Sequence, residues 1–195
     1  MNSNIEPKLA PPGAGLPGPE LYIARGLFAF RRLTGNRESF TIAFQQERER
    51  IAQLVHSIPA DSAGRQVLIE RPRGLEDSSR NWSVWMTLDH LRIVHRGITR
   101  SIDELTHGKM PEGKASTATV KPAQNVTSGV VAEYEKSCDD LLATVAAVPE
   151  LKTDLRYAHP WFGPLDAAGW HALAGTHLKI HRVQIERIIE GLNNS

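Results

Sequence analysis

The sequence predicts an all-α fold, namely a four-helix bundle with an accessory N-terminal helix and long interhelical connections. Four segments carry apolar residues at the three- and four-residue spacing that turns one side of a helix toward a core. Prolines or glycines follow these segments, and no internal repeat or second domain is visible. With 195 residues, of which 41% are hydrophobic and 23% charged, the composition suits one domain with a sizeable core.

The chain is expected to begin with a tail and the accessory helix. Residues 1–19 are rich in proline and glycine, which sustain neither helix nor sheet, so we predict a disordered or extended tail there. A single helical-bundle domain is predicted over residues 20–195. Its first segment, Glu20 to Leu33, has helical spacing and several arginines. A solvated helix face explains these arginines better than a patch for anionic ligands.

The first bundle helix is predicted from about Phe40 to Ile58, because apolar residues recur there at helical spacing around a highly charged run. Pro59 ends it. The following segment, from Ala60 to Arg80, is polar and contains glycines and a proline. We expect a long connection with at most one short strand, at Val67–Ile69.

The second and third bundle helices are separated by another long loop. Ser78 or Ser79 offers the N-cap of the second helix, which is predicted from Trp82 to about Thr106. Lys114–Gln124 is polar and reads as loop. The third helix is predicted over Val126–Val148, and a proline stops it.

The fourth bundle helix follows a compact aromatic turn, His159–Pro164, which is rich in turn-forming residues. Asp166 is positioned to cap this helix. The helical pattern continues to about Ile189, and Gly191 and Asn193 are expected to provide a C-terminal stop.

Charge and cysteine content exclude several classes of protein. A net charge of +1 favours neither nucleic acid nor an anionic membrane as partner, and no apolar run resembles a signal peptide or membrane span. The lone Cys138 cannot form an intrachain disulfide, so we expect a cytoplasmic protein in a reducing compartment. Because Cys138 lies on an apolar helical stripe, it is interpreted as a buried small hydrophobe rather than a nucleophile.

Two histidines in the fourth helix suggest a metal site. His177 and His181 are four residues apart, so both imidazoles project from the same side of the helix, beside its apolar stripe. His90 is the candidate third ligand: it lies eleven residues beyond Ser79, and His177 lies eleven beyond Asp166. If the second and fourth helices run parallel, as in an alternating bundle, the three rings meet at one level. Three neutral imidazoles leave coordination positions open, as in catalytic metal sites.

Other roles for the histidines stay open. Among eight histidines, a pair four apart arises by chance in roughly a quarter of shuffled chains, so this spacing is weak support alone. An inward histidine can also be a hydrogen-bonded core residue. His56, His95 and His107 are expected at the surface. His159 is expected to stabilise its turn, with a contact to a metal ligand or to a substrate as the alternative. Gln184, one turn beyond His181, is a candidate to orient a ligand or to form a hydrogen bond with a substrate.

Three stretches together resemble the DinB-like superfamily, the damage-inducible and YfiT-like metal-binding four-helix proteins. They are Trp82–His90, His159–Leu165 and the pattern His177-x-x-x-His181. The resemblance extends over most of the chain, from about Phe40 to Leu192. It implies a four-helix fold, to which this chain adds the N-terminal helix and long connections.

Carried over by position, the resemblance implies that His90, His177 and His181 are three metal ligands. It further implies a divalent ion such as zinc, nickel, iron or manganese, and frequently a homodimer. The activities it implies are those of thiol-dependent transferases and isomerases, or of hydrolases.

We therefore expect a metal-dependent enzyme that acts on a small-molecule substrate, as a thiol-dependent transferase or isomerase or as a hydrolase. A bound ion lowers the pKa of a coordinated water to about 7, or holds a low-molecular-weight thiol as thiolate. The alternative is a non-catalytic bundle that binds a metal or small ligand in a stress-related role. Nucleic-acid binding gains no support from the charge.

Overall fold

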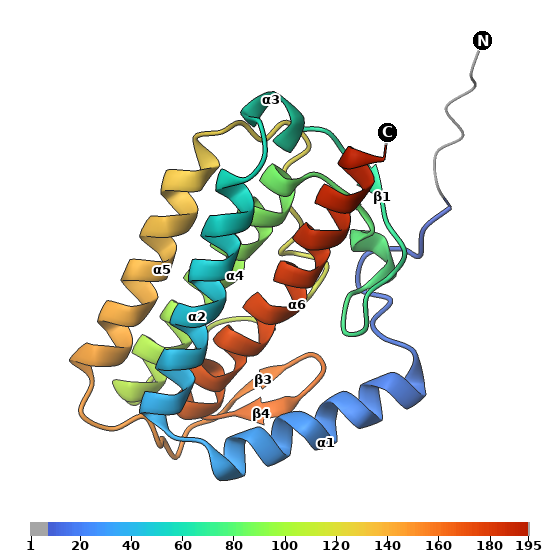
Figure 1. Ribbon diagram of the computed structural model, residues 1–195. Coiled ribbons are helices and arrows are strands. Elements are labelled where there is room, and N and C mark those ends of the chain that lie inside the picture. The colour runs from blue at the N-terminus through green and yellow to red at the C-terminus, as the bar shows by residue number, and fades with distance from the viewer. Residues whose placement is uncertain (1–7, 195) are drawn as a thin grey trace.

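The computed structural model describes residues 8–194 and shows a bundle of four long helices (Figure 1). These are α2 (Arg37–His56), α4 (Val84–Thr106), α5 (Val130–Ala147) and α6 (Ala167–Asn193). The accessory helix α1 (Gly18–Thr34) lies across one end of the bundle, and the one-turn helix α3 (Ala60–Ala63) follows α2. The predicted four-helix bundle with an accessory helix in front is confirmed.

The four helices do not alternate in direction. α2 and α6 run one way, whereas α4 and α5 run the other way (Figure 1). α4 packs against both α5 and α6, and α2 packs against α6. The expectation that the second and fourth bundle helices run parallel is therefore wrong, because the connection over residues 107–129 returns along the bundle and lets α5 start at the same end as α4.

Two small antiparallel sheets lie outside the bundle. β1 (Val67–Leu68) pairs with β2 (Asn81–Trp82), and β3 (Tyr157–His159) pairs with β4 (Gly163–Leu165). The short strand expected after the first bundle helix is present. The expected aromatic turn is the tip of the β3–β4 hairpin, where Gly163 has a φ of 71°, a conformation that glycine adopts at low cost.

Several helix ends differ from the prediction. α4 begins at Val84, and its N-cap is Ser83, whose Oγ accepts a hydrogen bond of 3.1 Å from the Met86 amide. The predicted caps Ser78 and Ser79 are wrong, because they lie in a short 3-10 turn, η1 (Asp77–Ser79), that precedes β2.

The third and fourth bundle helices also shift at their ends. α5 begins at Val130, four residues later than expected. Asp166 caps α6 as predicted, through a bond of 2.8 Å from the Gly169 amide to Oδ1. α6 does not end before Gly191 but continues to Asn193. A Cβ at Gly191 would lie 2.5 Å from Val67 Cγ1, so close packing against β1 explains this glycine.

The segment before α1 is extended and partly fixed to the fold. Ala10 N donates to Asp77 Oδ2 (2.7 Å) and Gly15 N donates to Glu76 Oε1 (3.1 Å). Leu16 is buried, and α1 starts at Gly18. Residues 1–7 of the predicted tail lie outside the described residues.

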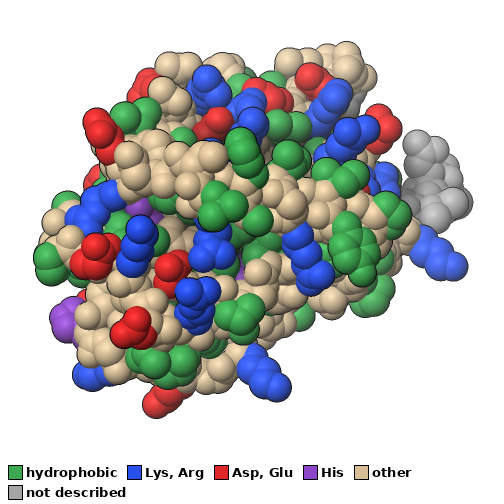
Figure 2. All heavy atoms as spheres, turned by 90° about the horizontal axis from the view of Figure 1, so that it is seen from below, with side chains coloured by type: hydrophobic (Ala, Val, Ile, Leu, Met, Phe, Trp, Pro, Cys, Tyr) green, Lys and Arg blue, Asp and Glu red, His purple; other side chains and the backbone are tan. Residues whose placement is uncertain are grey.

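α1 buries little of its apolar surface. Phe28 packs against Phe162 of the hairpin, with ring centroids 4.4 Å apart, and is the buried residue of this helix. The outer side carries exposed apolar residues: Tyr22, Ile23, Leu27, Phe30 and Leu33. Figure 2, which views this end of the molecule, shows apolar and basic side chains interspersed on the surface. Within residues 8–194, no helix has the length and hydropathy needed to cross a membrane.

α2 packs closely against α6 in the core. Phe44 is fully buried, and a Cβ at Gly175 of α6 would lie 3.2 Å from the Phe44 amide nitrogen. The absence of a side chain at Gly175 thus lets the two backbones approach. One turn further along α2, Arg48 forms ion pairs with Glu135 (2.6 Å) and Asp139 (2.7 Å) of α5.

Replacing Phe44 by alanine should lower the free energy of unfolding by about 3–5 kcal/mol, because it leaves a large cavity between α2, α4 and α6. Urea unfolding followed by circular dichroism measures the change. The matched control is Phe30→Ala on the outer side of α1, where the side chain is 66% exposed and a change below about 0.5 kcal/mol is expected. Similar losses in both variants would contradict the packing described for Phe44.

Candidate metal centre

The structure brings the three predicted ligands together. His90 lies in the second turn of α4, and His177 and His181 lie one turn apart in α6. His177 Nε2 is 3.2 Å from His90 Nε2 and 3.1 Å from His181 Nε2. One nitrogen of each ring lies within 4.8 Å of the other two. A metal ion could bind to this cluster, and the role of the three residues as ligands stays a prediction.

The antiparallel packing of α4 and α6 explains this meeting. The start of α4 lies beside the C-terminal half of α6, as the bond from Gln184 Nε2 to Ser79 O just before α4 also shows. His90 is therefore opposite His181 although the two helices run in opposite directions. The argument from equal distances to the caps predicted that these three side chains meet, but from a wrong premise.

Two of the three rings are held through their second nitrogen. His90 Nδ1 lies 2.6 Å from the Val120 carbonyl oxygen, and His181 Nδ1 lies 2.6 Å from Gln184 Oε1. Because oxygen atoms accept, each Nδ1 carries the proton and each Nε2 presents a lone pair. Gln184 is in turn fixed by its bond of 2.7 Å to Ser79 O. Its predicted orienting contact with a ligand is thus present.

The arrangement fits a divalent cation. The lone pairs of His90 and His181 both point toward His177 Nε2, which can donate a proton to only one of them. A cation would satisfy all three acceptors. In a tetrahedral zinc site, with bonds of about 2.0–2.1 Å, neighbouring ligand atoms lie about 3.3 Å apart. The observed separations of 3.1 and 3.2 Å are close to that spacing.

Burial keeps the three rings neutral. Loss of solvation, with the nearby Lys121 ammonium as a smaller cause, lowers the pKa of His90 to about 4. Burial and the neighbouring imidazoles lower the pKa values of His177 and His181 well below the ordinary value. A cation therefore meets three unprotonated ligands at neutral pH, as coordination requires.

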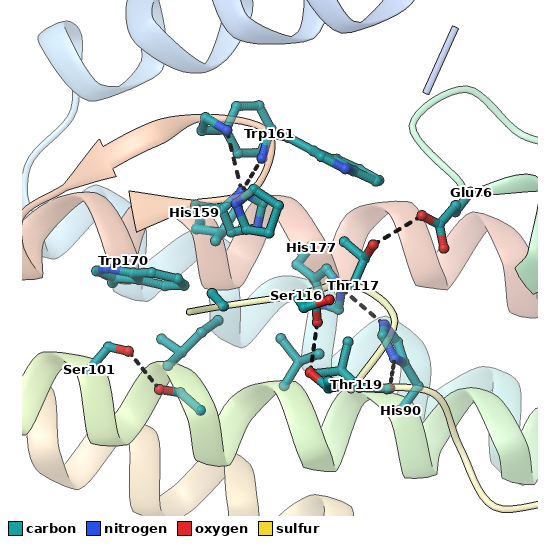
Figure 3. Close-up of a pocket in the computed structure, with 18 of the residues that line it drawn as sticks. Glu76, His90, Ser101, Ser116, Thr117, Thr119, His159, Trp161, Trp170 and His177 are labelled. Atoms are coloured by element: carbon teal, nitrogen blue, oxygen red, sulfur yellow. Dashed lines mark hydrogen bonds between the residues drawn. The ribbon is translucent and has the colours of Figure 1, made fainter. Parts of the chain in front are cut away.

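A cavity of about 270 Å³ opens beside the cluster (Figure 3). It is bounded by α4, α6, the β3–β4 hairpin and two connections, over residues 74–79 and 111–121. Aromatic side chains form much of one wall: Tyr157, His159, Trp161, Phe162 and Trp170. A mostly apolar concave site next to convergent polar groups is typical of a small-molecule site.

His159 stabilises the hairpin tip, as predicted. Its Nδ1 accepts hydrogen bonds from the amides of Trp161 (3.1 Å) and Phe162 (3.3 Å). Burial lowers its pKa to about 4, so the ring is neutral and its proton is on Nε2. The same residue lines the cavity, so the alternative role in substrate contact stays open.

A buried ion pair next to the cluster was not foreseen. Lys121 Nζ donates to Glu76 Oε2 (2.6 Å), and Glu76 Oε1 accepts from Gly15 N and Thr117 Oγ1. Although burial acts to raise the pKa of Glu76, the bonds from Lys121 and Ser78 hold it at about 2. The pair fixes the backbone beside Val120, and thereby the carbonyl that orients His90. Glu76 and Lys121 are 45 residues apart, so no local sequence pattern predicts this ion pair.

The surface location predicted for His95 is wrong. His95 is fully buried: its Nδ1 lies 3.1 Å from Ser137 Oγ, and its ring packs against Phe44. Because α4 is covered by both α5 and α6, its buried face is wider than one apolar stripe. His56 and His107 are exposed, as expected.

Cys138 is also buried, as expected from its apolar stripe. Burial raises the pKa of its thiol to about 12, which leaves it protonated and unreactive at neutral pH.

Comparisons with known proteins agree with this geometry. The family model of the DinB superfamily matches residues 43–185. Among solved structures, the one described as TT2238, a four-helix bundle protein, is 16% identical with a TM-score of 0.56. The match covers 77% of this chain and 98% of that chain, and at this identity it shows the fold alone. No curated protein matches.

Replacing Gln184 by alanine should weaken zinc affinity about 10- to 100-fold, because the His181 ring loses the acceptor that orients it. Competition against a chromophoric zinc chelator measures the affinity. Gln184→Glu retains an oxygen acceptor, so its zinc affinity is expected to fall less. The control is Gln53→Ala, whose amide contacts Glu49 on the exposed side of α2. Equal affinities in wild type and Gln184→Ala would contradict the orienting role.

His95 should make the fold sensitive to acid. Burial, with weaker effects of His181 and Arg48, lowers its pKa from 6.5 to about 3. Between these pH values the unfolded chain binds the proton and the folded protein does not. The contribution of His95 to stability is therefore complete above pH 6.5 and is lost as the pH falls toward 3, at about 1.4 kcal/mol per pH unit.

We accordingly expect His95→Phe to show a shallower decline of the free energy of unfolding from pH 6.5 to 4 than wild type. Urea titrations at several pH values, with a chelator present, measure the slope. The exposed His56→Phe should keep the wild-type slope. A wild-type slope in His95→Phe would mean that His95 is not buried as a neutral ring.

Proposed function

The chain belongs to the DinB superfamily, and from this membership and the histidine cluster we propose a metal-dependent enzyme that acts on a small-molecule substrate. His90, His177 and His181 would hold a divalent ion. The observation that carries this proposal is the convergence of three neutral imidazole nitrogens at one end of a cavity. Such a site leaves coordination positions for ligands that are not protein groups, which is typical of catalytic ions.

The ligand set suits zinc, nickel or iron, and manganese less well, because imidazole is a ligand of intermediate softness. When bound, a divalent ion acts as a Lewis acid and lowers the pKa of a coordinated water or thiol. This chemistry serves a hydrolase, or a transferase or isomerase that uses a low-molecular-weight thiol.

The protein groups around the cluster would orient and exclude water rather than exchange protons. Val120 and Gln184 fix the rings of His90 and His181, and the aromatic wall keeps the cavity apolar. The one buried carboxylate among the described cavity residues, Glu76, already accepts from Lys121, Thr117, Ser78 and Gly15. A general base from a carboxylate is therefore not part of the proposal.

A second candidate function is a non-catalytic bundle that binds a metal or small ligand in a stress-related role. The hydrogen bonds that already occupy the Glu76 carboxylate favour this candidate, because a binding module needs no free acid or base in its cavity. The two candidates share the ion and the cavity. They differ in catalytic turnover, which is expected of the enzyme and not of the binding module.

The homodimer and the cytoplasmic location are further proposals, supported by the family resemblance and by the reduced lone Cys138. Sedimentation velocity at micromolar concentration tests the first.

Protein purified without a histidine tag should contain about one equivalent of a divalent transition metal by plasma mass spectrometry. The His90→Ala, His177→Ala double variant should lose it, because one remaining imidazole binds weakly. The matched control is the double variant His56→Ala, His107→Ala, whose original side chains are exposed. Absence of stoichiometric metal from wild type, together with wild-type stability of the first variant, would contradict the metal site.

If the metal is present, the enzyme proposal expects turnover of an ester or of an electrophile with a small thiol. The His90→Ala, His177→Ala variant should lose at least a hundredfold in rate, since the chemistry depends on the ion. Metal binding without turnover across a broad panel of thiols and esters would favour the binding module instead.

A further inference from the structure

We propose that the cavity beside the three histidines takes an uncharged, largely apolar ligand about the size of one substituted aromatic ring, and that His159 donates a hydrogen bond to it. This assignment names the ligand class of the proposed site, so its link to a reaction rests on the proposed function. The binding itself can be measured without any reaction.

The walls of the cavity are apolar on several sides. Tyr157 stacks on Trp170 with ring centroids 5.7 Å apart, and Phe162 stacks on His159 at 5.1 Å. Aliphatic residues complete the lining from α4, α6 and the connection after β1: Leu75, Val94, Ile98, Leu173 and Ile180. These surfaces gain free energy when an apolar ligand displaces water from them.

The charged side chains inside the cavity are already paired, and the remaining charged residue at its edge, Glu112, is exposed to solvent. Lys121 donates to Glu76 at 2.6 Å and also contacts Ser78 and Ser79, so this pair has no free charge for a ligand. Arg100 pairs with Glu104 at 2.8 Å near the surface. A charged ligand group placed in the interior would therefore lose its solvation without gaining a partner, which is costly.

Hydroxyl groups along the cavity are also engaged within the protein. Ser101 Oγ donates to Gly97 O, Thr117 Oγ1 to Glu76 and Thr176 Oγ1 to Ala172 O. These bonds leave the walls with few free donors. They favour a ligand with little polar surface.

His159 supplies a fixed donor. Its Nδ1 accepts from the Trp161 and Phe162 amides, which leaves the proton on Nε2. No described residue is hydrogen-bonded to that nitrogen. The ring is held between Phe162 and the edge of Trp170, and Figure 3 shows it on the same wall as His177. A ligand oxygen in the cavity would complete this bond.

The volume sets the size of the ligand. An apolar protein cavity of about 150 Å³ holds one benzene molecule. The cavity here is about 270 Å³, which leaves room for a ring with a short substituent. A substituent directed toward the histidine cluster would reach the open positions of an ion.

Three probes of nearly equal shape test separately the effects of ligand charge and of the hydrogen bond: benzyl alcohol, benzylammonium and toluene. Dissociation constants are measured by ligand-observed NMR at pH 7.5 on the full chain as purified, and again after chelation of metal. We expect benzyl alcohol to bind at least tenfold more tightly than benzylammonium, because the ammonium finds no unpaired anionic partner inside the cavity. Benzyl alcohol should also bind about fivefold more tightly than toluene, the gain of one hydrogen bond.

Two variants locate the binding. His159→Phe keeps an aromatic ring but removes the donor, so it should abolish the preference for benzyl alcohol over toluene. Gly97→Trp should weaken both ligands at least tenfold, because Gly97 lines the cavity and a side chain there meets no atom within 4 Å. The matched control is Gly26→Trp, a helical glycine in α1 with equally open surroundings, which should bind as wild type does.

Equal or tighter binding of benzylammonium would overturn the assignment, as would wild-type affinities in Gly97→Trp. The assignment would also be overturned if the preference for benzyl alcohol over benzylammonium disappeared after chelation. In that case the ion, and not the cavity wall, would discriminate between the two ligands. Preserved selectivity in a protein that contains no metal would support the ligand class while contradicting the proposed metal site. The two proposals therefore fail in different ways.

Discussion

The opposed packing of α4 against α6 is the constraint on which the candidate centre depends. One histidine of the cluster comes from the start of α4 and two from the middle of α6, so their distance is set by the contact between these two helices. α2 reinforces the contact by packing closely on α6 at Gly175. The same helix contacts therefore determine both the packing of the core and the distances among the three imidazoles.

Burying three neutral imidazoles has an energetic cost that the surrounding polar groups partly offset. Val120 and Gln184 satisfy one nitrogen on each of two rings, and Gln184 is itself held by Ser79. His177 has no such anchor, because its Nδ1 is buried without a hydrogen-bond partner among residues 8–194. Two ring orientations are therefore fixed by other protein groups, and the third depends on helix packing and on contacts with those two rings.

The sequence was informative where local periodicity decides the outcome. Helical spacing identified α1, α2 and the four-helix architecture, and the spacing of His177 and His181 placed both rings on one side of α6. The three histidines lie together as predicted, although the predicted relative direction of two helices was wrong. Direction depends on the path of residues 107–129, which carries no periodic signal.

The features that could not be predicted from the sequence depend on contacts between segments far apart in the chain. His95 was expected at the surface because one apolar stripe does not show that α4 is covered on two sides. Glu76 and Lys121 lie in separate connections, and their pairing follows from how those connections meet. The short strands β2, β3 and β4 were not predicted, because two or three residues give too little pattern.

The parallel course of α4 and α5 has an evolutionary consequence. It requires the connection over residues 107–129 to travel back along the bundle, and on its way this segment forms one side of the cavity and supplies the Val120 carbonyl. Insertions and substitutions in such a connection leave the helix contacts of the core intact. Ligand preference can therefore diversify among descendants of this fold through a segment that lies outside the four core helices.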